Sequence, residues 1–412
     1  MVELVKQRIG SLRGIGPGLV MAATGLGAGD MIAASVAGAR YGTALLWAAV
    51  LGALMKYVMN EGLARWQLAT GTTLLEGWVH RLPLFFSMYF FIYLLLWTFI
   101  VAAALIAASG IAAHALIPSL SVAQWGVIHS LLALVLVVSG RYGLLERLMK
   151  VFMALMMLVV IICALLVLPE IDGLLNGLLF PSIPEGSTLF IFGVIGGVGG
   201  SVTLLCYGYW IRECNWTTRE DLAQSRTDLA VAYILTGLFG MAIMIISAGV
   251  SPEQATGPDM ALSVARRLEL VVGPVGMWLF LIGFWCAVFS SMLGVWQGVP
   301  YLFTDFVQQY TSHDKTPRKV NTRSIEYRSY LIYLAIPPMG LLLADKPVWL
   351  VIAYAVAGAF FMPLLGIILL FLNNRRRWLG DLRNGYITNL LLVASVLVFA
   401  LVMVDKIAKQ FG

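Results

Sequence analysis

The sequence predicts an all-α polytopic membrane protein with eleven transmembrane helices: two inverted repeats of five helices, followed by one extra helix. Of its 412 residues, 60% are hydrophobic and 12% are charged, whereas about 25% of the residues in soluble domains are charged. The apolar residues gather in runs long enough to cross a bilayer. Two of these runs, one in each half of the chain, are interrupted by clustered glycines.

Each predicted span is close to the roughly 20 residues that a helix needs to cross the hydrocarbon core. The first span follows a basic stretch but has no small-residue cleavage site, so we interpret it as a retained span rather than a signal peptide. The predicted spans are 15–38, 43–66, 83–110, 122–140, 147–168, 188–211, 227–250, 273–303, 328–344, 347–372 and 386–406.

The Lys and Arg residues sort to one side of these spans. Most of the 27 fall in the N-terminal stretch or in loops on its side of the membrane; the exceptions are Arg40, Arg266, Arg267, Lys346, Lys406 and Lys409. Because cytoplasmic loops are rich in Lys and Arg, this predicts a cytoplasmic N-terminus and a C-terminus outside. We expect a multi-pass protein of the cell membrane whose partners are the bilayer and a small ion. No protein partner is required, and a monomer could suffice.

Spans one to five and six to ten form halves of similar length. They correspond to residues 1–170 and 171–372, while residues 373–412 add a basic loop and the eleventh span. An odd number of spans in each half inserts the second half upside down relative to the first, which is the inverted repeat of LeuT-type transporters. All parts belong to one membrane domain, and the polar loop Thr311–Arg328 is the expected flexible connection.

The glycine clusters fall in the first span of each half, at Gly25–Asp30 and at Gly193–Ser201. Glycine costs about 1 kcal/mol within a helix, and an aspartate at the centre of a membrane helix costs roughly 2.5–3.5 kcal/mol. We therefore expect helices 1 and 6 to be unwound at mid-membrane. Unwound backbone is tolerated there where it lines a cavity, and its carbonyls can ligate a cation.

The two breaks predict the substrate site, with Thr24–Asp30 facing Gly196–Thr203. Two alternatives remain open: the glycines could serve helix packing alone, as we expect of Gly52 and Gly294, or Asp30 could be hydrated at a mouth of the protein. Asp30, Gly27 and Gly197 would hold a metal ion. The predicted substrate-binding residues are Thr24, Gly27, Gly29, Asp30, Gly197, Gly200, Ser201 and Thr203.

Other chemistry is not indicated by the sequence. The four cysteines and four histidines are scattered, with no CxxC motif and no ligand-spaced pair. No nucleophile–base pair or cofactor fingerprint is visible, so we expect neither an enzyme nor a cofactor. The net charge of +6 follows the loops and does not indicate nucleic-acid binding. A sensor or scaffold role is disfavoured because no soluble domain accompanies the spans.

Several short motifs match those of a known family. They are Gly16-Pro17-Gly18, Leu45-Leu46-Trp47, Leu63-Ala64-Arg65 followed by Ala69-Thr70-Gly71, Ser290-Ser291 with Gln297, and Leu379–Asn384. In these motifs, and over most of its length, the chain resembles the Nramp divalent-metal transporters. The resemblance implies a metal ion as substrate and adds Ser290, Ser291 and Gln297, together with Lys56, as candidate pathway residues.

The family's metal-binding motifs are altered in this chain. Its Asp-Pro-Gly-Asn motif in the first break aligns with Gly27–Asp30, and its sixth-span Met and His align with Gly200 and Val202. Without a thioether, the site has no evident preference for soft transition metals. One carboxylate in a widened, backbone-lined site suits a hydrated Mg²⁺. The resemblance therefore implies transport of Mg²⁺, with poor selectivity against Mn²⁺, by alternating access.

Proton coupling is expected to be weak or absent. The stretch Tyr93–Gly110 aligns with the family's acidic proton path but holds no carboxylate, histidine or lysine, and proton relays need titratable chains.

Lys56 in the second span leaves an alternative function open. A cation beside a cation pathway repels the substrate. If Lys56 faces the cavity, a small organic anion or zwitterion is favoured, with its carboxylate bound by the glycine-rich breaks. Glu61 and Arg65, which lie four residues apart on the same helix, are expected to pair.

Overall fold

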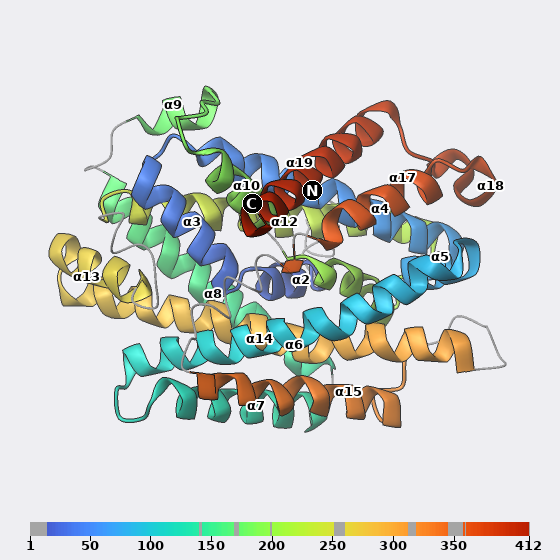
Figure 1. Ribbon diagram of the computed structural model, residues 1–412, viewed down its shortest axis with the longest axis horizontal. Coiled ribbons are helices and arrows are strands. Elements are labelled where there is room, and N and C mark those ends of the chain that lie inside the picture. The colour runs from blue at the N-terminus through green and yellow to red at the C-terminus, as the bar shows by residue number, and fades with distance from the viewer. Residues whose placement is uncertain are drawn as a thin grey trace, which may run out of the picture.

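The computed structural model describes residues 15–139, 142–168, 173–197, 200–250, 260–311, 319–344, 357–358 and 360–411, in which all the regular elements are helices (Figure 1). The helices of the first half are α2 (Pro17–Gly25), α3 (Ala28–Tyr41), α4 (Leu46–Thr70), α5 (Leu74–Arg81), α6 (Leu84–Leu116), α7 (Val122–Ser139) and α8 (Tyr142–Val167).

The second half follows a short helix, α9 (Leu174–Leu179). It contains α10 (Thr188–Gly197), η2 (Val202–Leu205), α11 (Cys206–Glu213), η3 (Arg219–Asp221), α12 (Leu222–Ser247), α13 (Met260–Val272), α14 (Pro274–Thr311), α15 (Ile325–Ala335), η4 (Pro337–Ala344) and α17 (Phe361–Asn373). The chain then continues through α18 (Arg376–Leu379), η5 (Gly380–Leu382) and α19 (Tyr386–Phe411).

Each of the eleven predicted segments contains helix where the structure describes it. By length and composition, α6, α7, α8, α12 with η3, and α14 could each cross a membrane, and α2 with α3 pass the same test as one bent span. The number of eleven spans is not fixed by this test. Part of the tenth segment, at 345–356, and part of the loop Thr311–Arg328, at 312–318, lie outside the described residues.

Four short helices were not predicted as elements: α5, α9, α13 and α18. They are too short or too polar to resemble spans. α5 begins at a capping box, in which the Thr73 hydroxyl accepts from the Glu76 N–H and the Glu76 carboxylate accepts from the Thr73 N–H. This local sequence signal could have located α5.

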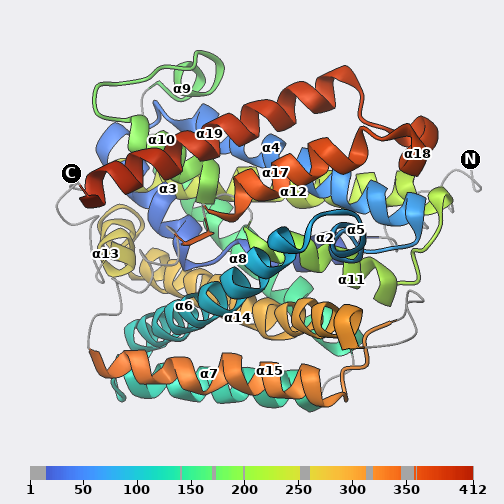
Figure 2. The same cartoon turned by 45° about the vertical axis from the view of Figure 1, so that its right-hand side comes forward.

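The half-helix α2 lies at the centre of the molecule, packed against α8, α11, α12 and α14. On one side of it α6 and α14 cross, and α7 lies beside α15 at the edge of the bundle (Figure 2). On the other side α19 packs on α4 and α17. Large apolar side chains such as Phe85, Val135, Leu165 and Leu397 are exposed on the outer helices, as expected of surfaces that face lipid.

Glycines bring the central helices close together. A Cβ at Gly52 of α4 would lie 2.9 Å from the Cα of Ile195 in α10, and one at Gly294 of α14 would overlap the Thr24 side chain of α2. The expectation that these two glycines serve close packing is confirmed. The interior therefore has no room for even a methyl group at either contact.

Candidate functional site

The first break divides the first span into two half-helices bent by 59°. α2 ends at Gly25, Leu26 and Gly27 are not helical, and α3 begins at Ala28. Asp30 falls in the first turn of α3, where the positive end of the helix dipole stabilises a carboxylate. Asp30 is 8% exposed, so it lies inside the protein rather than at a hydrated mouth. Gly29, its neighbour, is part of the same helical turn.

Two serines of α14 cover the carbonyl groups at the end of α2. Ser291 Oγ donates to the Thr24 carbonyl oxygen over 2.7 Å, and Ser290 Oγ donates to that of Ala23 over 3.3 Å. Gly27 packs directly on Ser291, since a Cβ at Gly27 would stand 2.7 Å from the Ser291 hydroxyl. The Thr24 hydroxyl bonds within its own helix, to the Val20 carbonyl. The carbonyl groups of this break are thus already engaged by hydroxyl donors.

The second break follows α10, which ends at Gly197, and the helix resumes at Val202. Residues 198 and 199 lie outside the described residues. Gly200 has a φ of +82°, a left-handed conformation that glycine adopts readily. The side chains of Ser201 and Thr203 are buried, and within the described part of the chain neither hydroxyl oxygen makes a hydrogen bond. Because buried polar groups are nearly always hydrogen-bonded, these two hydroxyls are suited to a ligand.

The two breaks face each other, as the sequence predicted. A Cβ built on Gly200 would stand 2.5 Å from Thr203 Oγ1, 3.3 Å from the methyl carbon of Met21 and 3.5 Å from the Cα of Gly25. The last two atoms belong to the first break and the turn before it. The side chain of Met21 therefore lies beside the position at which the family has a metal-binding methionine.

Lys56 reaches from α4 into the second break. Its ammonium nitrogen donates to the Gly196 carbonyl over 3.1 Å and to the Gly200 carbonyl over a shorter distance. The residue is completely buried, and Asp30 is close enough for its negative charge to act on the ammonium group. Lys56 thus faces the region between the two breaks.

Gln297 lies away from the breaks, among the helices of the second half. Its side chain accepts from Trp210 Nε1 over 2.5 Å and donates to the Tyr301 hydroxyl over 3.1 Å. Its backbone carbonyl accepts from the Tyr327 hydroxyl over 2.8 Å. These contacts join α11, α14 and α15, which gives Gln297 a role in packing.

The pair of Glu61 and Arg65 forms as predicted, with an N–O distance of 3.1 Å. Arg226 of α12 also pairs with Glu61, at 2.8 Å.

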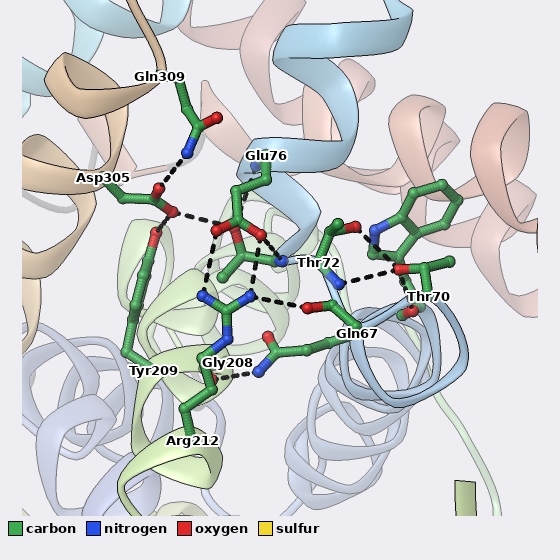
Figure 3. Close-up of polar contacts among 12 residues, drawn as sticks. Gln67, Thr70, Thr72, Glu76, Gly208, Tyr209, Arg212, Asp305 and Gln309 are labelled. Carbon is green, nitrogen blue, oxygen red and sulfur yellow. Dashed lines mark hydrogen bonds and ion pairs between the residues drawn. The ribbon is translucent and has the colours of Figure 1, made fainter. Parts of the chain in front are cut away.

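A buried polar network below the second break was missed by sequence reasoning (Figure 3). Glu76 of α5 pairs with Arg212 of α11, at 2.9 Å. Asp305 of α14 accepts from the hydroxyls of Thr73 and Tyr209, at 3.0 and 2.5 Å, and from Gln309. From the sequence, Arg212 had been assigned only to the cytoplasmic charge excess, because its partner is 136 residues away in the chain.

The described residues contain no group of three or more His, Cys, Asp or Glu side chains placed to hold a metal ion. Any cation in the central region would therefore depend on Asp30, hydroxyl groups, backbone carbonyls and water. These are the oxygen ligands that hard cations such as Mg²⁺ prefer.

Comparison with known proteins identifies first the class and then the family. The fold is that of the LeuT-type transporters. The model superimposes on the Eremococcus coleocola manganese transporter with a TM-score of 0.78, at 16% identity over 97% of this chain and 87% of that one. MhsT, solved in complex with L-phenylalanine, matches with a TM-score of 0.66, at 16% identity over 96% of this chain and 98% of that one.

The model of the family described as "Natural resistance-associated macrophage protein-like", Nramp, matches residues 18–409. The chain therefore belongs to the Nramp family. Among curated proteins it is 26% identical over 280 residues to a divalent metal cation transporter, MntH, of Chromohalobacter salexigens. That alignment spans 63% of this chain and 62% of the relative.

Proposed function

We propose that this protein is a membrane transporter that moves a divalent cation by alternating access, with the ion bound between the two helix breaks. The observation that carries the proposal is the pair of buried hydroxyls at Ser201 and Thr203, which have no hydrogen-bond partner in the described residues, opposite the break that bears Asp30. Family membership supports it, as do the names of the relatives, one a divalent metal cation transporter and the other a manganese transporter.

The preferred ion in this proposal is Mg²⁺, with poor selectivity against Mn²⁺. Oxygen atoms of Asp30, Ser201 and Thr203 are hard ligands, and Mg²⁺ usually keeps several waters while binding one or two carboxylates. Gly27 and Gly197 would contribute backbone groups only. The cation is the substrate and no cofactor is invoked.

Weak or absent proton coupling is also part of the proposal. The interior stretch of α6 from Tyr93 to Gly110 offers no carboxylate, histidine or lysine. Proton relays in transporters are chains of such groups. We further propose that the protein lies in the cell membrane with its N-terminus in the cytoplasm, its C-terminus outside, and a single chain as the working unit.

A second candidate function is transport of a small organic anion or zwitterion. The observation that favours it is Lys56, whose ammonium group lies at the second break. An ammonium ion there would attract a carboxylate, and the amide groups of the glycine-rich breaks could bind it.

Uptake into proteoliposomes tests the first function. Purified protein is reconstituted, and Mg²⁺, Mn²⁺ and lumenal pH are followed with separate dyes. We expect Mg²⁺ and Mn²⁺ to enter without lumenal acidification, and Asp30→Asn to reduce that flux at least tenfold. Asp381→Asn, which changes an exposed aspartate in the loop after α17, is the matched control and should leave the flux unchanged.

Two results would overturn the assignment. Full flux in Asp30→Asn would remove Asp30 from the site. No flux of either cation in the wild-type protein would favour the second function, which a thermal-shift screen of small carboxylates and amino acids would then examine.

A further inference from the structure

The Lys56 ammonium group occupies acceptor atoms that a transported cation would use. In an unwound transporter helix, the freed carbonyls are the groups that coordinate the ion. Here the carbonyls of Gly196 and Gly200, at the two ends of the second break, both accept from Lys56 Nζ. The lysine is thus a positive charge supplied by the protein itself.

The packing of α4 on α10 fixes this position. Gly52 lies one helical turn before Lys56, on the same face of α4. A Cβ at Gly52 would stand 2.9 Å from the Ile195 Cα, so the absence of a side chain lets the two backbones approach closely. The next turn of α4 then places Lys56 beside the last turn of α10, where the ammonium meets the Gly196 carbonyl.

Three features make the buried charge tolerable. The ammonium sits at the C-terminal end of α10, where the helix dipole favours a cation. It donates to two carbonyl oxygens, and the negative charge of Asp30 acts on it. Lys56 and Asp30 therefore carry charges that offset each other in the region between the breaks.

The same features set a cost for a cation substrate. An entering ion meets a like charge in a region shielded from water, and its carbonyl ligands at the second break are already engaged. It gains those ligands only if the Lys56 side chain withdraws. Neutralising the lysine removes both obstacles.

We propose that Lys56 is a tethered cation that competes with the transported ion and so sets the cation affinity of the central site. This inference rests on the proposed divalent-cation transport. It assigns to Lys56 a role in affinity, beyond stabilising the second break.

Titration of Mn²⁺ and Mg²⁺ into detergent-solubilised protein, followed by calorimetry, tests the role. We expect Lys56→Gln, which keeps a donor but removes the charge, to bind both ions at least tenfold more tightly than the wild type. Lys56→Met, which removes the donor as well, should also bind more tightly. Lys150→Gln is the control, because Lys150 pairs with Glu146 on α8 and its side chain is 33% exposed; its affinity should stay at the wild-type value.

A second measurement uses the wild-type chain and does not depend on the variants folding. Reductive methylation of lysines is followed by mass spectrometry with and without saturating Mn²⁺. Lys56 is fully buried, so we expect slow labelling that accelerates when the ion displaces the ammonium, while labelling of Lys150 is unchanged.

The outcomes separate the two proposals. Equal or weaker cation binding in folded Lys56→Gln, or labelling of Lys56 that Mn²⁺ leaves unchanged although Mn²⁺ binds, overturns the role of Lys56 while cation transport stands. If neither the wild type nor Lys56→Gln binds a divalent ion, the proposed function fails and the role of Lys56 fails with it.

Discussion

The Arg212 guanidinium and the Glu76 carboxylate form a two-point ion pair, with Nη1–Oε1 at 3.2 Å and Nη2–Oε2 at 2.9 Å. Both side chains are at most 10% exposed. Arg212 also donates to the Gly71 carbonyl, where α4 ends (Figure 3). The pair therefore ties α11, the helix after the second break, to the connection between the second and third spans.

Removing one member of this pair should destabilise the protein strongly. Glu76→Gln leaves the buried Arg212 charge without its carboxylate, and breaking a buried ion pair in this way costs about 3–5 kcal/mol. We expect a lower melting temperature in detergent, measured by tryptophan fluorescence. Lys319→Gln, which breaks a 3.9 Å contact of a 48%-exposed lysine with Glu213, should change it little. Similar shifts for the two variants would contradict the importance of the buried pair.

The Asp228 carboxylate anchors the start of α2. It accepts from the N–H of Gly16 over 3.0 Å, from that of Gly18 over 2.6 Å and from the Tyr207 hydroxyl over 2.9 Å. Asp228→Asn replaces one acceptor oxygen with a donor that faces these donors. Because hydrogen bonds to charged groups are worth about 1.5–3 kcal/mol, we expect a loss of about 2 kcal/mol.

The same denaturation assay on Asp221→Asn provides the comparison. Asp221 accepts from the N–H groups of Thr217 and Thr218, both at 2.9 Å, in an exposed turn. Its loss should be smaller, because water can replace the bonds. An Asp228→Asn variant as stable as the wild type would show that α2 does not need this anchor.

Much of the fold was accessible from the sequence because hydrophobic runs of about 20 residues have few alternatives to membrane helices. The positions of the two breaks were accessible for a similar reason, since clustered glycines and Asp30 make continuous helix unfavourable. Short helices such as α5 and α13 lack a long apolar run, and composition alone did not separate them from loops.

The partners of individual polar residues could not be predicted, because they depend on contacts distant in the chain. Lys56 bonds to Gly196, 140 residues away, and Thr73 to Asp305, 232 residues away. The sequence identified Lys56 as a charge within a span, but it did not show on which side of α4 the charge would lie. The hydroxyls of Ser201 and Thr203 were predicted as site residues, whereas their lack of protein partners in the described residues required the structure.

Gly200 should tolerate no side chain. Its φ is +82°, and a left-handed conformation costs an L-residue roughly 1–2 kcal/mol; a Cβ would also press on Thr203 Oγ1. We expect Gly200→Ala to lower the melting temperature and to weaken cation binding. A methionine, which would restore the soft ligand of the family, would meet the same strain.

Gly193→Ala on α10 is the matched control for this change. A Cβ there meets no atom within 4 Å, and alanine is favoured over glycine within a helix by about 1 kcal/mol. That variant should be as stable as the wild type or more so. A destabilisation equal to that of Gly200→Ala would show that the conformation of Gly200 is not the cause.

Met21 offers a test of ion preference that does not disturb Gly200. Its methyl carbon lies 3.3 Å from the point where a Cβ of Gly200 would stand, so its thioether is near the second break. On the proposed preference for oxygen ligands, Met21→Leu, which replaces sulfur with carbon at similar size, should change the ratio of Mg²⁺ to Mn²⁺ uptake by less than a factor of two. Cd²⁺, a softer ion, is measured in parallel. A selective loss of Mn²⁺ and Cd²⁺ uptake of tenfold or more would instead identify the Met21 sulfur as a ligand, because thioethers favour soft metals, and the Mg²⁺ preference would have to be abandoned.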